Sequence, residues 1–255
     1  MPSKEYYEGR DLERLGLLHE MLKQNLALDS VTSDGSTQTK GDVIGVKNGK
    51  NVPISVKNAS GKNTQVHLPT LNSFAQQTNM PEEIKAKLEK FFGTNNDAIW
   101  TGWLPEQAVL SPYEKSHRRL KSANIESWTD VENWFNNCRL DIAQLLVQYL
   151  KKDSEPVVYL VWVNKKTKAY QIIDVDKLIS WISDKCTWVT TPGQTVLRCN
   201  TEDDAKPIFT LQMKGSRIKD KPGCYDRNPQ FHLYPHWPAD IVLHQGTLNE
   251  KDSSS

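Results

Sequence analysis

The residues best suited to chemistry lie in one short stretch, Lys40 to Lys62, with the sequence KGDVIGVKNGKNVPISVKNASGK. Asp42 begins an alternating, β-rich segment, and Asn48-Gly49 is typical of a tight hairpin turn. The segment after the turn carries Ser55-Val56-Lys57. A hairpin of this kind brings a carboxylate and an ammonium together, and such a pair can cleave a phosphodiester.

A divalent cation is expected at this site, because it can neutralise the charge that develops on a phosphate during cleavage. Mg²⁺ prefers oxygen ligands and takes one or two carboxylates while keeping several waters. Asp42 and the backbone carbonyl of Val56 are the expected ligands. Side chains alternate along a strand, so Ser55 and Lys57 should share a face while Val56 points into the core. Lys57 is expected to orient or deprotonate the attacking water and to offset phosphate charge.

An Asp, a hairpin and then an acid-x-Lys strand resembles the signature of the PD-(D/E)XK nucleases, which include most type II restriction endonucleases. Fourteen residues separate Asp42 from Lys57, which lies within the range usual for the family. The chain departs from the pattern at two positions. Gly41 stands where Pro is common, and Ser55 stands where an acid is usual.

A second likeness lies in the N-terminal helix, where residues 14–20 read Arg-Leu-Gly-Leu-Leu-His-Glu. This is similar to the helix of one family member that also has a non-acidic residue two positions before its Lys. The resemblance implies that Glu20 completes the catalytic and metal site, with Glu13, one heptad earlier, as the alternative. It also implies a restriction-endonuclease-like fold and a Mg²⁺-dependent, sequence-specific endonuclease that leaves 5′-phosphates.

The partners implied by the resemblance are double-stranded DNA and a companion DNA methyltransferase encoded nearby, and the protein is expected to be a monomer or a homodimer. Two other interpretations stay open. Ser-x-Lys in an Asn-Gly hairpin occurs by chance in many β-rich proteins, so the stretch can be a polar surface ribbon. Ser55 in place of an acid also fits a non-catalytic DNA-binding or regulatory protein with a degenerate nuclease fold.

Basic charge gathers in two stretches although the net charge is only +1. Residues 40–63 hold five lysines against one aspartate, and residues 206–227 hold four lysines and two arginines against two aspartates. This pattern favours a positive cleft. Arg, Lys, Asn and Gln side chains can read base edges. The expected DNA-binding residues are Lys62, Asn63, Gln65, His67, Gln212, Lys214, Ser216, Arg217, Lys219, Arg227 and Gln230.

The elements that must position these residues follow from hydrophobic periodicity. It predicts helices over residues 10–27, 81–92, 129–151 and 174–184, and strands over residues 157–163, 169–173, 188–189, 196–199, 207–214 and 230–234. Helices and strands mixed without a βαβ rhythm favour the α/β (α+β) class, with a mixed central β-sheet flanked by helices. One nuclease domain is expected over 1–255, with the catalytic hairpin in 1–150 and a β-rich DNA-recognition part in 151–248.

The expected location is the cytoplasm. Four cysteines without a CxxC pair fit a reducing compartment and argue against a zinc module or a disulfide framework. No apolar run reaches about 18 residues, so no membrane span is expected. The N-terminal residues lack the apolar segment of a secretory signal.

Overall fold

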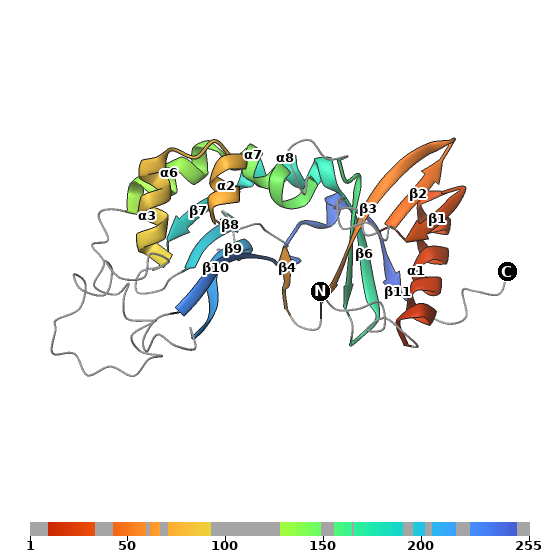
Figure 1. Ribbon diagram of the computed structural model, residues 1–255. Helices are drawn as coiled ribbons and strands as arrows, with labels where there is room; N and C mark the ends of the chain where they lie inside the picture. Colours follow the sequence, from red (N-terminus) through yellow and green to blue (C-terminus); the bar gives the residue numbers. More distant parts are fainter. Residues whose placement is uncertain are drawn as a thin grey trace. The chain divides into compact units, whose positions relative to one another are not determined.

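The computed structural model describes residues 10–33, 43–59, 62–66, 71–92, 128–148, 156–164, 166–190, 196–201, 206–217 and 225–248. These residues form two compact units (Figure 1). Unit 1 takes its described residues from 1–64, 147–178 and 237–255, and unit 2 from 65–146 and 179–236. Each unit therefore combines segments from both halves of the chain. The expected functional division into 1–150 and 151–248 stays a prediction.

Unit 1 is built on a six-stranded sheet with the order β1-β2-β3-β5-β6-β11. Its central neighbours β3 and β5 pair in parallel, and the other neighbouring strands pair antiparallel. The strands are β1 (Ser30–Ser33), β2 (Val43–Lys47), β3 (Lys50–Ala59), β5 (Tyr159–Asn164), β6 (Ala169–Asp174) and β11 (Val242–Thr247). The mixed sheet with accompanying helices confirms the predicted fold class.

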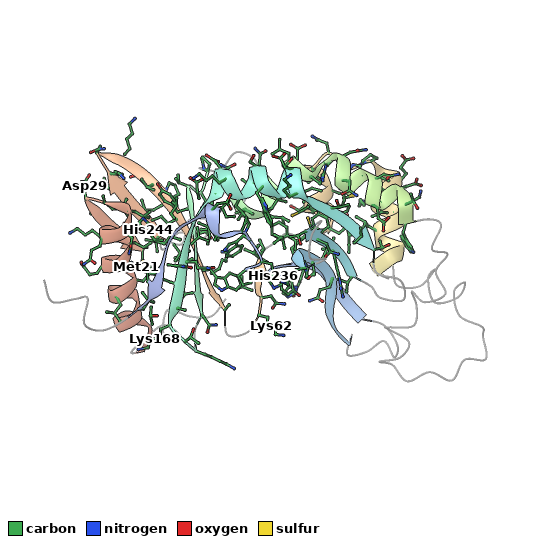
Figure 2. The ribbon with its side chains drawn as sticks, turned by 180° about the vertical axis from the view of Figure 1, so that it is seen from behind. Met21, Asp29, Lys62, Lys168, His236 and His244 are labelled. Carbon is green, nitrogen blue, oxygen red and sulfur yellow. The ribbon has the colours of Figure 1, made fainter. Side chains whose placement is uncertain are left out.

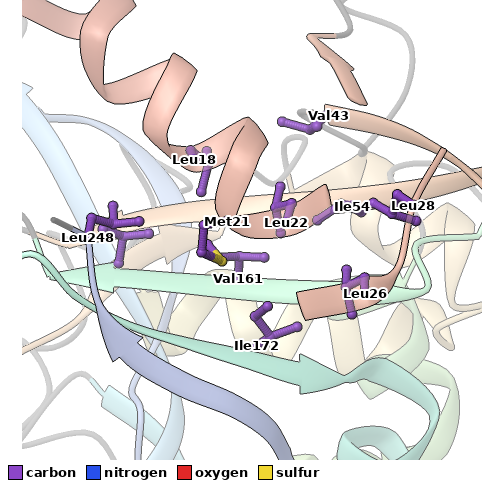
Figure 3. Packing of buried hydrophobic residues seen from close by; sticks show 11 residues of the cluster. Leu18, Met21, Leu22, Leu26, Leu28, Val43, Ile54, Val161, Ile172 and Leu248 are labelled. Carbon is purple, nitrogen blue, oxygen red and sulfur yellow. The ribbon is translucent and has the colours of Figure 1, made fainter. Parts of the chain in front are cut away.

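Helix α1 (Arg10–Leu26) covers one face of this sheet, as Figure 3 shows. Leu18, Leu22 and Leu26 recur at four-residue spacing, which puts them on one side of the helix. They are buried against strand residues that include Ile54 and Val161. The apolar face predicted from the leucine spacing is therefore the face that packs on the sheet.

The predicted Asn-Gly hairpin joins β2 to β3. Asn48 (φ 53°) and Gly49 (φ 72°) both have positive φ, and Lys47 pairs with Lys50 on either side of them. A two-residue turn of this kind matches the twist of the strands that it connects. Asp29, just after α1, accepts a hydrogen bond from the Asn48 backbone N–H at 2.8 Å. This bond holds the turn to the segment just after α1, and the turn fixes the register of β3 against β2.

Unit 2 contains a five-stranded sheet with the order β4-β10-β9-β8-β7. Its strands are β4 (Thr64–Val66, whose first residue is the last of unit 1), β7 (Cys186–Thr190), β8 (Val196–Thr201), β9 (Pro207–Arg217) and β10 (Tyr225–Leu233). The helices are α2 (Leu71–Gln77), α3 (Glu82–Phe92), α6 (Thr129–Asn137) and α7 (Arg139–Ala143). The π-helix η3 (Gln144–Gln148) begins in this unit and ends in unit 1. Helix α8 (Val175–Lys185) begins in unit 1 and ends in unit 2.

The core of unit 2 is a cluster of aromatic rings. Trp188 has ring neighbours from both strands and helices, with centroids 5.0 to 6.3 Å away. The rings in contact are Phe74, Trp134, Phe135, Trp188, Phe209 and Phe231. Trp134 and Trp188 therefore contribute to the packing of this unit.

The single helix predicted for residues 129–151 is wrong, because the chain breaks at Cys138 between α6 and α7. The side chain of Asn136 pairs with both the N–H and the C=O of Trp188 at 2.8 and 2.9 Å. Arg139 donates to the carbonyl of Cys186. These bonds satisfy backbone groups of β7, and such long-range contacts override local helical periodicity. Thr129 is the first residue of α6, and Trp128 occupies the N-cap position.

Candidate functional site

Strand β3 places the candidate catalytic residues on one face of the six-stranded sheet. Ile54 belongs to the core under α1, and Val56 packs against the same core. Ser55 and Lys57 alternate with them and so face the other side. The expected arrangement of this strand, with Val56 inward and Ser55 beside Lys57, is what the backbone produces.

The environments of the two polar residues differ. Ser55 is fully buried, and Lys57 is half-buried. In the parallel ladder with β5, Ser55 pairs with Leu160 and Lys57 pairs with Trp162. Lys57 therefore lies on a central strand with a large apolar residue next to it. This environment differs from that of a solvent-exposed hairpin tip.

Asp42 lies outside the described residues, as do His67 and Lys219. Asp42 immediately precedes Val43, the first residue of β2, and Val43 pairs with Ile54. Within the described residues the β2–β3 register ends at that pair, whereas the β3–β5 register continues to Ala59. The chain therefore enters β2 next to the segment that carries Ser55 and Lys57.

Glu20 is not brought together with Lys57. Helix α1 packs on the face of the sheet that Val56 contacts, which is opposite to the face of Lys57. Glu20 is exposed and lies about 200° around the helix from Leu18, away from the sheet. Its neighbour His19 has a pKa lowered by partial burial, an effect that the charge of Glu20 partly offsets. Glu13 lies in α1, and its side chain is outside the described residues.

No group of three or more His, Cys, Asp or Glu side chains that could hold a metal ion is present in the described parts of the chain. The candidate oxygen ligands at β3 are the Val56 carbonyl and the Ser55 hydroxyl, and Asp42 directly precedes the paired strand β2 in the sequence. A set of one carboxylate and neutral oxygens is chemically suited to Mg²⁺, which keeps water as further ligands. It does not suit zinc, which takes nitrogen and sulfur ligands.

The three cysteines in the described part of the chain offer no second site. Cys138, Cys186 and Cys199 are free thiols. Burial, followed by the hydrogen bond with Cys186, raises the pKa of Cys199 well above its usual value. A neutral, buried thiol is neither a good nucleophile nor a metal ligand.

Most of the expected DNA-binding residues lie on the β9–β10 hairpin. The structure continues both strands further than the sequence predicted, so residues expected in a polar turn are paired. The register sets Gln212 opposite Gln230 and Arg217 opposite Tyr225, and brings Arg227 opposite Gly215. The candidates Gln212 and Gln230, eighteen residues apart in sequence, are thereby adjacent in space.

The two faces of this hairpin have different compositions. Phe209, Leu211 and Phe231 are buried on the aromatic side. By alternation, the opposite face carries Thr210, Gln212, Gln230 and His232 among the side chains that the structure describes. The side chains of Lys214, Ser216, Arg217 and Arg227 lie outside the described residues. Of the expected DNA-binding residues on this hairpin, Gln212 and Gln230 therefore share the polar face.

Two residues of the polar face were missed by sequence reasoning. His232 is almost fully buried, and its Nδ1 lies 2.9 Å from Nε2 of Gln212. Thr210 is also buried, and pairs with His232 across the strands. Both lie within the strands predicted over 207–214 and 230–234, and strand alternation from Gln212 and from Gln230 would have placed Thr210 and His232 on this face. His236, labelled in Figure 2, contacts the Pro207 carbonyl at 2.8 Å through Nδ1.

The remaining candidates lie at β4. Gln65 is in β4, which neighbours β10 in the five-stranded sheet. Lys62, labelled in Figure 2, is exposed, and Asn63 is half-buried, just before this strand.

None of the helices in the described parts of the chain is long and apolar enough to cross a membrane.

Comparison with known proteins gives similarity at the level of structure. No protein-family model matches the chain, and no curated protein matches it. The crystal structure of the restriction endonuclease MspI in complex with its cognate DNA is similar over 90% of this chain and 81% of that chain. The sequence identity is 13% and the TM-score is 0.46. A similarity of this size does not assign the chain to a family.

Proposed function

We propose that this protein is a Mg²⁺-dependent, sequence-specific endonuclease of the type II restriction class that cleaves double-stranded DNA. One observation carries the proposal. Ser55 and Lys57 share a face of a central strand, Val56 anchors that strand in the core, and the paired strand starts directly after Asp42. This is the arrangement that an Asp…x-x-Lys phosphodiesterase site requires, built on strands rather than on a mobile loop.

In the proposed site, Asp42 and the Val56 carbonyl hold the cation, and Lys57 orients the attacking water and offsets phosphate charge. Mg²⁺, when bound, neutralises charge that develops on the phosphate. The water oxygen forms the new bond to phosphorus while the bond to the 3′ oxygen breaks, which leaves a 5′-phosphate and a 3′-hydroxyl. The buried Ser55 keeps this face of β3 polar without adding a second negative charge.

The β9–β10 hairpin is the proposed DNA-contacting element. Gln212 and Gln230 face each other across the ladder, and Lys214 and Ser216 follow in the paired part of β9. Amide side chains can pair with adenine edges, and lysine with guanine edges or with phosphate. Lys62, Asn63, Gln65, His67 and Lys219 are proposed as further contacts, and Arg217 and Arg227 as phosphate contacts.

The test is cleavage of plasmid DNA by the purified full chain in the presence of Mg²⁺. We expect discrete fragments with 5′-phosphate ends from the wild type. Asp42→Asn and Lys57→Ala should abolish cutting while DNA binding, measured by gel shift, is retained. Lys50→Ala is the matched control, because Lys50 is an exposed lysine of the same strand that pairs only at the turn.

Three outcomes overturn this site assignment: no cutting by the wild type in Mg²⁺ or Mn²⁺, normal cutting by either site variant, or loss of cutting in the Lys50→Ala control. DNA binding by a wild type that never cuts would favour the non-catalytic DNA-binding alternative. The fully buried Ser55, in place of an acid, is the observation that keeps this alternative in view.

A further inference from the structure

A row of three residues crosses the six-stranded sheet on the face of Lys57. Lys57 on β3 pairs with Trp162 on β5, and Trp162 pairs with Gln171 on β6. Trp162 lies between Val161 and Val163, which both belong to the core under α1. Its indole therefore points to the opposite face, the one that Lys57 shares.

The indole of Trp162 is held in place from a second direction. Its ring centroid lies 5.7 Å from that of Trp237, with the two planes at 79°. The Nε1–H of Trp237 donates to the Oε1 of Gln171 at 3.2 Å. Trp162 and Trp237 are 6% and 8% exposed, respectively. Both rings are fixed by packing, and Gln171 ties the pair to the neighbouring strand.

We propose that Trp162 is a positioning residue for Lys57, an inference that rests on the proposed nuclease function. A lysine side chain has a flexible four-carbon stem, and its ammonium must be restrained to act on one water. A fixed indole on the neighbouring strand gives the stem an apolar surface to lie along and gives the ammonium a π face. The Trp237–Gln171 contact keeps that surface from turning away.

Cleavage kinetics separate positioning from mere packing. We expect Trp162→Leu to lower the single-turnover cleavage rate by about tenfold or more, because small misplacement of a catalytic group is costly. KM and the Kd for DNA should stay within about twofold, since neither measures the orientation of Lys57. Trp162→Phe should restore most of the rate, because it keeps an aromatic face.

The matched control is Trp134→Leu, a ring of the aromatic cluster in unit 2. It should lower the unfolding midpoint without slowing cleavage at temperatures where the variant is folded. Equal rate losses in Trp134→Leu and Trp162→Leu would overturn the proposal, as would full activity of Trp162→Leu.

A second measurement does not depend on activity. In protein labelled with 5-fluorotryptophan, the ¹⁹F resonance of Trp162 is assigned by its loss in Trp162→Phe. Lys57→Met, which removes the charge at similar length, should shift that resonance and leave the one of Trp134 unchanged. An unmoved Trp162 resonance overturns the inference even in an enzyme that cuts. If the wild type never cuts, the proposed function itself fails and the positioning role fails with it, whatever the resonance does.

Discussion

Val56 and Lys57 are neighbours in β3, yet they face opposite sides of the six-stranded sheet. Val56 packs against the core under α1, and Lys57 lies beside Trp162 on the other side. The apolar side chain fixes the register and the roll of the strand, because a slip by one residue would expose Val56 and bury the lysine among leucines. The position of the proposed catalytic lysine is thus a consequence of core packing.

Replacing Ser55 with an acidic residue should make the free energy of unfolding depend on Mg²⁺. Ser55→Asp puts a carboxylate at a fully buried position, so we expect a loss of about 2 kcal/mol or more in the free energy of unfolding without metal. If Mg²⁺ binds beside β3, it should restore part of the lost free energy of unfolding, since a ligand at 100 times its Kd stabilises the folded state by about 2.7 kcal/mol.

Urea unfolding with and without Mg²⁺ measures this effect, and Ser55→Asn is the neutral control. A metal-induced stabilisation of Ser55→Asp no larger than that of Ser55→Asn would argue against a cation at this position.

Glu20 should be dispensable for cutting. It is exposed on the side of α1 that faces away from the sheet. Glu20→Gln should therefore change the cleavage rate by no more than about twofold and the free energy of unfolding by no more than about 0.5 kcal/mol. Since the charge of Glu20 raises the pKa of His19, the variant should show a lower His19 pKa in an NMR titration. A large loss of cutting would restore Glu20 to the metal site.

The Asn-Gly turn should be sensitive to a single methyl group. Gly49 has φ +72°, where an L side chain is strained although space is open around it. Gly49→Ala should cost about 1 kcal/mol. Gly16 lies in α1 with nothing within 4 Å of an added Cβ, so Gly16→Ala should stabilise by about 0.5–1 kcal/mol. Denaturant midpoints that move in the same direction for both would contradict this account.

The β9–β10 hairpin should separate affinity from specificity. Lys214→Ala should reduce the slope of log K against log salt by about 1 if Lys214 contacts a phosphate. Gln212→Ala should relax preference at one base pair by about 1–3 kcal/mol if its amide reads a base edge. Binding to a panel of duplexes at several salt concentrations measures both. Lys166→Ala, at an exposed turn of unit 1, should leave the salt slope and the base preference unchanged. The same effect from all three variants would contradict the assignment of Lys214 and Gln212 as DNA contacts.

Much of the local structure was predictable from periodicity and turn chemistry. The leucines of α1, the Asn48-Gly49 turn and the alternation of Val56 with Lys57 each follow from interactions among nearby residues. The break at Cys138 did not follow, because it depends on Asn136 pairing with Trp188, fifty-two residues away. The length of β9 and β10 was missed for a related reason, since their polar ends are held by each other's backbones.

The sequence by itself determined the hairpin and the face that Lys57 shares with Ser55, since strand alternation and positive-φ turn residues are local properties. Only the tertiary structure decided what lies beside them. The pairing of β3 with β5 joins segments about a hundred residues apart and puts Trp162 next to Lys57. The same packing puts α1 on the opposite face and takes Glu20 away from the site. Which strands become neighbours depends on the burial of apolar surface across the whole unit, and no local pattern records that.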